Sequence, residues 1–215
     1  MTLVHQTIPA EHIPSLLRNG HYFTPCHSFP DKMEFYYGYC LFTCAMFSEQ
    51  DIHKCVEHAR NNREINQWAH STCVSCWVSE LRDEPAMWKV HGKQSAAIRL
   101  SLNVDRLCQH VQARGHRIAF GRVTYEGITS LVRPQFLVHW GLTEAEDSVH
   151  HFFFHKRGCY EWEQEFRVIL ASNEGTCVPL VDNMIESIMI SPLSKLDPTL
   201  ERSLRDRFGD LVRSP

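Results

Sequence analysis

The chain has 215 residues, of which 43% are hydrophobic, and a formal net charge of -3 at pH 7. This length allows one substantial core, and the charge gives no overall attraction to nucleic acid, although a local basic patch would still bind phosphates. The first residues lack a basic segment followed by an apolar one, and no stretch approaches about 18 uncharged apolar residues. We therefore expect a soluble, cytoplasmic protein that makes no membrane contact.

The first half of the chain predicts alternating short strands and helices. A strand over 3–7 precedes a helix over 10–19, which ends at Gly20 as a glycine C-cap. A short strand at 22–24 is followed by a helical insertion over about 31–67, rich in aromatic residues and cysteine. The next predicted elements are a strand at 73–78, a short helix that carries Met87 and Trp88, a strand at 96–102 and a helix at 103–112.

The second half is richer in strands. Glycine, proline or charged turns separate the candidates, which are 117–125, 136–140, 149–155, 165–171 and 185–191. An amphipathic helix over about 197–212 closes the chain, with Asp197 as its N-cap and Pro198 at its first position. No linker divides these elements, so we predict one α+β domain over 1–215, with a mixed, mainly antiparallel sheet flanked by helices.

Cysteines and tryptophans are expected to serve the core. The nine cysteines are an odd number without framework spacing, which is typical of reduced thiols. Cys73 and Cys76 have zinc-knuckle spacing, but they lie in a predicted strand that would turn them to opposite faces, so no metal site is predicted. Met87 and Trp88 are predicted to be structural, with Trp88 packed next to Trp77.

Charged residues gather where the strand at 165–171 begins. Glu163, Glu165 and Arg167 alternate along the entry into an apolar run, and Lys156 and Arg157 precede them. Carboxylates in such a partly desolvated place are suited to catalysis. The structural alternative is an ion pair of Glu165 with Arg157 or Arg167 that only fixes strand register.

Five ordered motifs resemble a widespread bacterial family that is known mainly as a domain of unknown function. They cover about half of the chain, from about residue 73 to 170. The motifs are Cys76-Trp77, Ala86-Met87-Trp88-Lys89, Ala97-Ile98-Arg99-Leu100-Ser101, Gly121-Arg122-Val123-Thr124-Tyr125, and Lys156-Arg157 through Glu163-Gln164-Glu165-Phe166-Arg167. The tyrosine that usually follows the Met-Trp-Lys helix is His91 here.

A more distant resemblance is to the ADP-ribosyltransferases. A strand with His5-Gln6-Thr7, a short helix, a glycine and a second short strand look like the opening of that fold, and Glu163-Gln164-Glu165 is similar to its closing Glu-x-Glu. The resemblance implies an ADP-ribosyltransferase-like fold with NAD as substrate. It assigns the nicotinamide mononucleotide half of NAD to His5 and the neighbouring hydroxyl of Thr7. The remaining residues that we assign to NAD binding are Tyr22, Ser101 and Arg157.

The expected reaction is NAD-dependent ADP-ribose transfer to a macromolecule, or NAD hydrolysis. Breaking the bond between ribose and nicotinamide produces an oxocarbenium-like cation, which a nearby carboxylate stabilises. The resemblance gives this role to Glu165, and Glu163 would act as general base on the incoming nucleophile. The acceptor is a protein or a nucleic acid, and a bacterial toxin, effector or phage-defence component would use such chemistry. Glu165→Gln is expected to fold normally.

Two other functions remain open from the sequence. A nucleic-acid-processing enzyme would use His151, His155, Lys156, Arg157 and Arg167 as phosphate ligands, although no acidic arrangement typical of metal nucleases is present. A non-catalytic binding or scaffold module would use the charged cluster only as a structural network. Release of nicotinamide from NAD distinguishes the three.

Overall fold

The computed structural model describes residues 2–29, 31, 35–38, 40, 49–79, 88–89, 92, 96–126, 137–140 and 151–214. They form an α+β domain with a mixed, mainly antiparallel sheet and several helices, which confirms the predicted class. The chain divides into two compact units, each built from segments that are far apart in the sequence. The first unit comprises Met1–Tyr22, Trp77–His110 and Cys177–Pro215, and the second comprises Phe23–Cys76 and Val111–Thr176.

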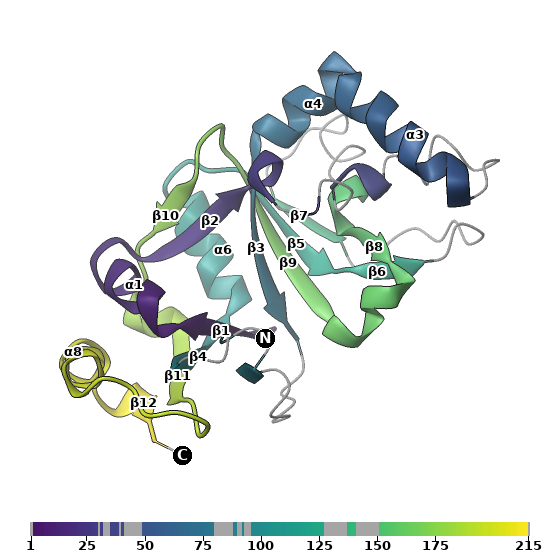
Figure 1. The fold of residues 1–215 in the computed structure, drawn as a ribbon. Helices are drawn as coiled ribbons and strands as arrows, with labels where there is room; N and C mark the ends of the chain where they lie inside the picture. Colours follow the sequence, from purple (N-terminus) through teal and green to yellow (C-terminus); the bar gives the residue numbers. More distant parts are fainter. Residues whose placement is uncertain are drawn as a thin grey trace. The chain divides into compact units, whose positions relative to one another are not determined.

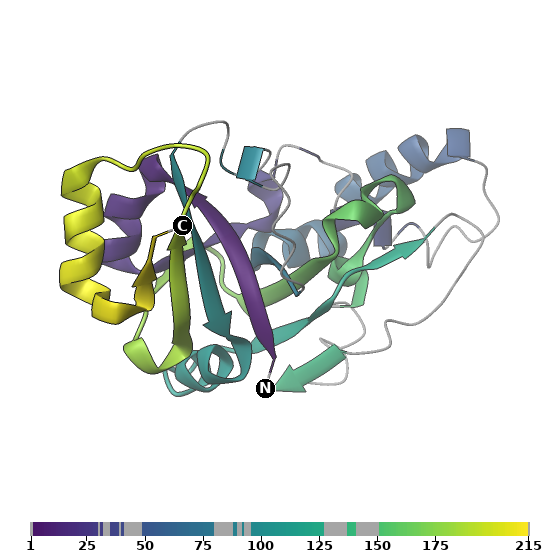
Figure 2. The same ribbon diagram turned by 90° about the horizontal axis from the view of Figure 1, so that it is seen from below.

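The first unit is organised on strands in the order β12-β11-β4-β1 (Figure 2). Strand β4 is antiparallel to both β1 and β11, and its residues are all buried because it lies in the middle. Strand β12 is parallel to β11 and forms the edge. The strands are β1 (Leu3–Pro9), β4 (Ala97–Asn103), β11 (Ile185–Ile190) and β12 (Val212–Arg213).

Two capped helices of this unit, α1 and α8, lie side by side (Figure 2). Helix α1 ends at Gly20, whose φ of 91° confirms the predicted glycine cap. Asp197 caps α8 as predicted, accepting hydrogen bonds from two backbone N–H groups. The predicted extension of α8 to 212 is wrong, because the helix stops at Gly209 (φ 54°) and gives way to η6 and β12. The helices are η1 (Ala10–His12), α1 (Ile13–Asn19), η5 (Asp182–Met184), α8 (Pro198–Phe208) and η6 (Gly209–Leu211).

Helix α6 (Val104–Gln112) begins in the first unit as predicted, with Asn103 accepting a hydrogen bond from the N–H of Arg106 at 3.1 Å. Trp88 is 5% exposed, and the Arg99 guanidinium lies 5.4 Å from its ring centroid. Its predicted structural role is therefore consistent with its burial. Met87 and its predicted helix start lie outside the described residues.

The strand order continues as β3-β9-β5-β7, mainly in the second unit (Figure 1). Strand β2 also pairs with β3, and β10 pairs with β2, and each of these two strands has residues in both units. Strand β5 is antiparallel to β7 and β9, and β2 is antiparallel to β3. Strands β6 and β8 form a separate parallel pair. The strands are β2 (His21–Pro25), β3 (Thr72–Val78), β5 (Ile118–Arg122), β6 (Thr124–Glu126), β7 (Leu137–Trp140), β8 (His155–Arg157), β9 (Glu165–Ala171) and β10 (Thr176–Val178).

Helices of this unit include two neighbours, α3 and α4, that meet at Asn62 (Figure 1). Of the segment predicted to be helical over 31–67, the described residues 35–38, 40, 49–61 and 63–67 are helical, Asp31 and Asn62 are not, and α4 continues to His70. The helices are η2 (Cys26–Ser28), α3 (Glu49–Asn61), α4 (Arg63–His70), η3 (His151–Phe154) and η4 (Gly158–Glu163), and residues 35–38 are also helical.

Two strand predictions in this unit are wrong. The predicted strand at 117–125 is interrupted at Val123, whose N–H donates to the Glu165 carbonyl, so its halves join different sheets as β5 and β6. Of the predicted strand at 149–155 the structure describes 151–155, where His151–Phe154 form the 3-10 helix η3 and His155 begins β8. The consecutive residues Phe153 and Phe154 are both buried in one core cluster, which the alternating faces of a strand would not allow.

Within the described part of the chain, we find no helix with the length and apolar character needed to cross a membrane.

Candidate functional site

His5 and Ser101, two residues assigned to NAD binding, form a buried pair in the first unit. They are direct partners in the register of β1 and β4, and His5 Nδ1 and Ser101 Oγ are hydrogen-bonded at 2.8 Å. Their exposed fractions are 2% and 3%. Thr7 on the same strand is half-buried, and Tyr22 is 49% exposed. The structure thus brings His5 and Ser101 together and leaves Tyr22 accessible to solvent.

The charged cluster at the start of β9 lies in the second unit, around the Glu165 carboxylate. Arg167 Nε donates to Glu165 Oε1 at 2.6 Å, and Nη2 donates to Oε2 at 3.1 Å. Residues two apart on a strand share one face, so the alternation of charge seen in the sequence produces this two-point contact. Lys156 Nζ, which β8 carries, donates to Oε2 at 3.2 Å.

Burial and ion pairing compete to set the charge of Glu165. Burial alone would raise the pKa of this carboxyl group, but the charge and hydrogen bonds of Arg167 and the charge of Lys156 outweigh it, together with a Cys76 hydrogen bond. The result is a pKa lowered from 4.5 to about 2. Glu165 is therefore a carboxylate at neutral pH, although it is only 5% exposed.

Glu163 reaches the same cluster by a backbone path that the sequence did not predict. Because Glu163 and Glu165 are two residues apart, the sequence predicts an extended segment that turns both carboxylates to the same side. Instead Glu163 ends the 3-10 helix η4, and Gln164 follows with a left-handed φ of 45°. Lys156 Nζ donates to Glu163 Oε2 at 2.6 Å, so one ammonium group bridges the two carboxylates. The Glu163 side chain is 18% exposed, which is more than that of Glu165.

Further groups close the cluster around Arg167, which is fully buried. Its Nη1 donates to the Phe153 carbonyl at 2.5 Å, and its guanidinium lies 5.7 Å from the Phe35 ring centroid. The Tyr125 hydroxyl accepts a hydrogen bond from the Glu165 N–H at 2.7 Å. Burial, followed by the nearby Glu165 charge, raises the pKa of Tyr125 despite that hydrogen bond. Tyr125 was singled out in a motif, but its place beside Glu165 was not predicted.

Arg157 pairs with groups other than the two carboxylates. Its Nη2 donates to Asp31 at 2.7 Å and to the Tyr160 hydroxyl at 3.1 Å. The ion pair that the sequence left open, Glu165 with Arg157 or Arg167, is therefore made by Arg167.

The resemblance to the ADP-ribosyltransferases also implies that the strands of His5 and Glu165 are neighbours in one sheet, and this expectation is wrong. Strand β3 lies between β1 and β9 in the strand order, with Val78 opposite His5. His5 belongs to the first unit and Glu165 to the second. A strand order of this kind depends on long-range pairing that local sequence patterns do not encode.

The cysteines of the zinc-knuckle pattern have other partners. The Cys73 thiol donates to the Glu174 carbonyl at 3.1 Å, and burial raises its pKa to about 11. Cys76 contributes to the Glu165 cluster. Among the described residues, no group of three or more His, Cys, Asp or Glu side chains is arranged to hold a metal ion.

Comparison with known proteins gave no matching family model, no similar curated protein and no similar solved structure.

Proposed function

We propose that this chain is an ADP-ribosyltransferase-like enzyme that consumes NAD, and that Glu163 is the carboxylate that reaches the substrate. The observation that carries the proposal is the pair of carboxylates fixed by Lys156 at the start of β9. The local elements required by the resemblance support it: β1 with His5 and Thr7, then α1, Gly20 and β2.

The contacts of the two carboxylates favour different roles from those given by the resemblance. A carboxylate offers about four acceptor positions, and Glu165 uses them for Arg167 Nε, Arg167 Nη2, Lys156 and the Cys76 thiol. Glu163 uses Oε2 for Lys156, whereas its Oε1 accepts no hydrogen bond from any residue that the structure describes. Glu163 therefore has an oxygen available for a ribose hydroxyl, and Glu165 positions Lys156.

In this scheme the Glu163 carboxylate stabilises the oxocarbenium-like cation as the bond from ribose to nicotinamide breaks. Lys156 holds the carboxylate in place, so little reorganisation is needed when the positive charge develops. The contributions of His5, Thr7, Tyr22, Ser101 and Arg157 to NAD binding stay predictions, as does a macromolecular acceptor.

A non-catalytic binding or scaffold module is the second candidate, and the charge balance of the cluster favours it. Two negative groups, Glu163 and Glu165, meet two positive groups, Lys156 and Arg167, and all four are in ion pairs. Such a closed network holds β8, η4 and β9 in register without any chemistry. The nucleic-acid-processing alternative gains no support, because buried Lys156 and Arg167 are paired with carboxylates rather than turned to a phosphate.

Nicotinamide release from NAD by the purified full chain tests the proposal. We expect the wild type to release nicotinamide. Glu163→Gln should release it about a hundredfold more slowly, which is the usual effect of removing one group that stabilises a developing charge. Glu161→Gln is the matched control, because Glu161 is an exposed residue of the same 3-10 helix. It should retain full activity.

Thermal melting of the same samples distinguishes the two candidates. Replacing the partly exposed Glu163 should lower the melting temperature by only about 2–4 °C, which corresponds to about 1 kcal/mol. A wild type without nicotinamide release would reject the enzyme proposal in favour of the binding module. An active enzyme whose Glu163→Gln variant is unimpaired would reject the role of Glu163.

A further inference from the structure

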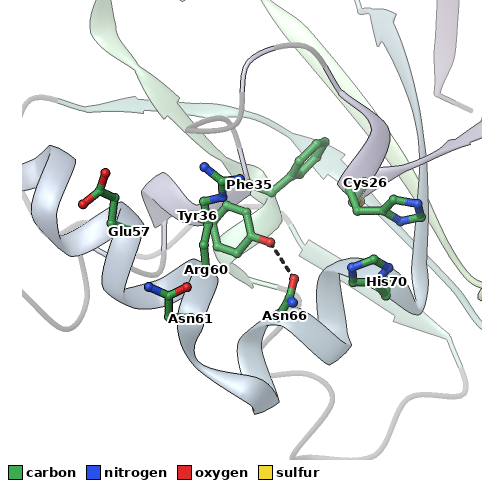
Figure 3. A pocket seen from close by; sticks show the side chains of 9 residues that line it. Cys26, Phe35, Tyr36, Glu57, Arg60, Asn61, Asn66 and His70 are labelled. Carbon is green, nitrogen blue, oxygen red and sulfur yellow. Dashed lines mark hydrogen bonds between the residues drawn. The ribbon is translucent and has the colours of Figure 1, made fainter.

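A polar cavity of about 610 Å³ opens in the second unit (Figure 3), and its described lining residues include none to which the sequence analysis assigned a function. Its polar walls come from η2, the helical residues 35–38, α3 and α4. The side chains that matter for recognition are His27, Tyr36, Arg60, Asn61, Asn66 and His70. The volume lies within the range of about 300–1,000 Å³ that is typical of small-molecule sites.

Helical spacing explains why these side chains converge. Glu57, Arg60 and Asn61 stand three and four residues apart on α3, and therefore share one face of that helix. Asn66 and His70 are four residues apart on α4. The short connection at Asn62, which accepts a hydrogen bond from the Ile65 N–H at 3.2 Å, starts α4 beside the end of α3. Two helix faces thus meet at one cavity.

Several side chains of the cavity offer hydrogen-bond donors. The Arg60 guanidinium is exposed and makes no hydrogen bond or ion pair within the described part of the chain. Asn66 Oδ1 accepts a hydrogen bond from the Tyr36 hydroxyl at 3.1 Å, which leaves the amide nitrogen as a donor (Figure 3). The amide of Asn61 adds a further donor, and Glu57 is the one wall residue limited to accepting among those that the structure describes.

Aromatic surface accompanies these donors. The rings of His27 and His70 are stacked, with centroids 4.2 Å apart and planes 18° apart. Phe35 forms part of the cavity wall. Flat rings provide contact area for another planar ring. Arginine, for its part, binds phosphate through two parallel N–H groups.

We propose that this cavity binds a nucleoside monophosphate, with Arg60 on the phosphate, the amides of Asn61 and Asn66 on polar groups of the nucleoside, and the stacked histidines beside the base. A free phosphate would fill only a small part of 610 Å³, and a nucleoside without phosphate would leave Arg60 without its partner. This site is independent of the proposed NAD chemistry, which uses Glu163.

Isothermal titration of the full chain with AMP, adenosine and inorganic phosphate tests the proposal. AMP should bind, adenosine should bind at least about tenfold more weakly, and inorganic phosphate should also be weaker, since each probe lacks part of the recognised group. Adenosine binding as tightly as AMP, or phosphate binding as tightly as AMP, would contradict the assignment. Absence of AMP binding would overturn it altogether.

Two variants locate the site. Arg60→Gln should weaken AMP binding at least about tenfold without a change in melting temperature, because Arg60 is exposed. Arg63→Gln is the matched control, since Arg63 is an exposed arginine that begins the neighbouring helix α4 and does not line the cavity. Asn66→Asp keeps the acceptor for Tyr36 but adds a negative charge, so it should also weaken binding. AMP affinity unchanged in Arg60→Gln and Asn66→Asp would place the ligand elsewhere.

Discussion

Replacing Glu165 with glutamine is expected to destabilise the protein, in contrast to the normal folding that the sequence alone suggests. Glutamine keeps one acceptor oxygen, but its amide group turns N–H donors toward Arg167 and Lys156. Arg167 is 0% exposed, so water cannot replace the lost carboxylate. Breaking a buried ion pair on one side costs about 3–5 kcal/mol, because the remaining charge stays buried without compensation.

The pKa of Glu165 gives an independent magnitude. A lowering from 4.5 to about 2 corresponds to about 3 kcal/mol of native-state stabilisation of the ionised form. Because the folded-state pKa is depressed, this contribution is complete above the pKa of the unfolded chain and is lost as the pH falls from 4.5 toward 2. We therefore expect Glu165→Gln to lose about 3–5 kcal/mol at pH 7.

Urea unfolding at pH 7, followed by tryptophan fluorescence, measures this loss. Glu163→Gln is the comparison, since Glu163 is more exposed and its removal leaves Lys156 paired with Glu165. We expect it to cost about 1 kcal/mol. A Glu165→Gln protein within about 1 kcal/mol of the wild type would refute the assignment of Glu165 as the centre of a buried network. So would an acid-induced loss of stability between pH 4.5 and 2 that is equally large in wild type and Glu165→Gln.

Three further perturbations, at Gly20, His21 and Trp88, test the fold of the first unit. A Cβ at Gly20 would lie 2.2 Å from the Val178 carbonyl oxygen, so Gly20→Ala should lower the melting temperature markedly. Gly115 also has a left-handed φ, of 80°, but has open space around it, so Gly115→Ala should reduce the free energy of unfolding by only about 1 kcal/mol. Burial lowers the pKa of His21 from 6.5 to about 4. The free energy of unfolding should therefore fall by about 3 kcal/mol as the pH drops from 6.5 to 4, because the unfolded chain binds a proton that the folded protein does not. Urea titrations of His21→Gln should not show this decline. Trp88→Ala should lose about 3–5 kcal/mol by urea unfolding, and a normal melting temperature would show that Trp88 is not structural.

The sequence determined the local elements and their caps. Apolar periodicity located strands such as Glu165–Ala171, and the residues with special backbone or capping chemistry marked the helix ends at Gly20, Asn103 and Asp197. These features depend on interactions between residues close in the chain, so their pattern is visible without the fold. The sequence also showed that charged residues gather at the start of β9, and it gave Arg167 as one of two candidate partners for Glu165.

Only the tertiary structure decided which of these residues meet. The break between β5 and β6, the helical turn at Phe153 and the position of β3 between β1 and β9 follow from strand pairing and core packing over long sequence separations. The same applies to Lys156, whose bridging of Glu163 and Glu165 requires β8, η4 and the left-handed turn at Gln164 together. The cavity around Arg60 likewise forms only where helices with separate sequence patterns pack, since no motif links their lining residues.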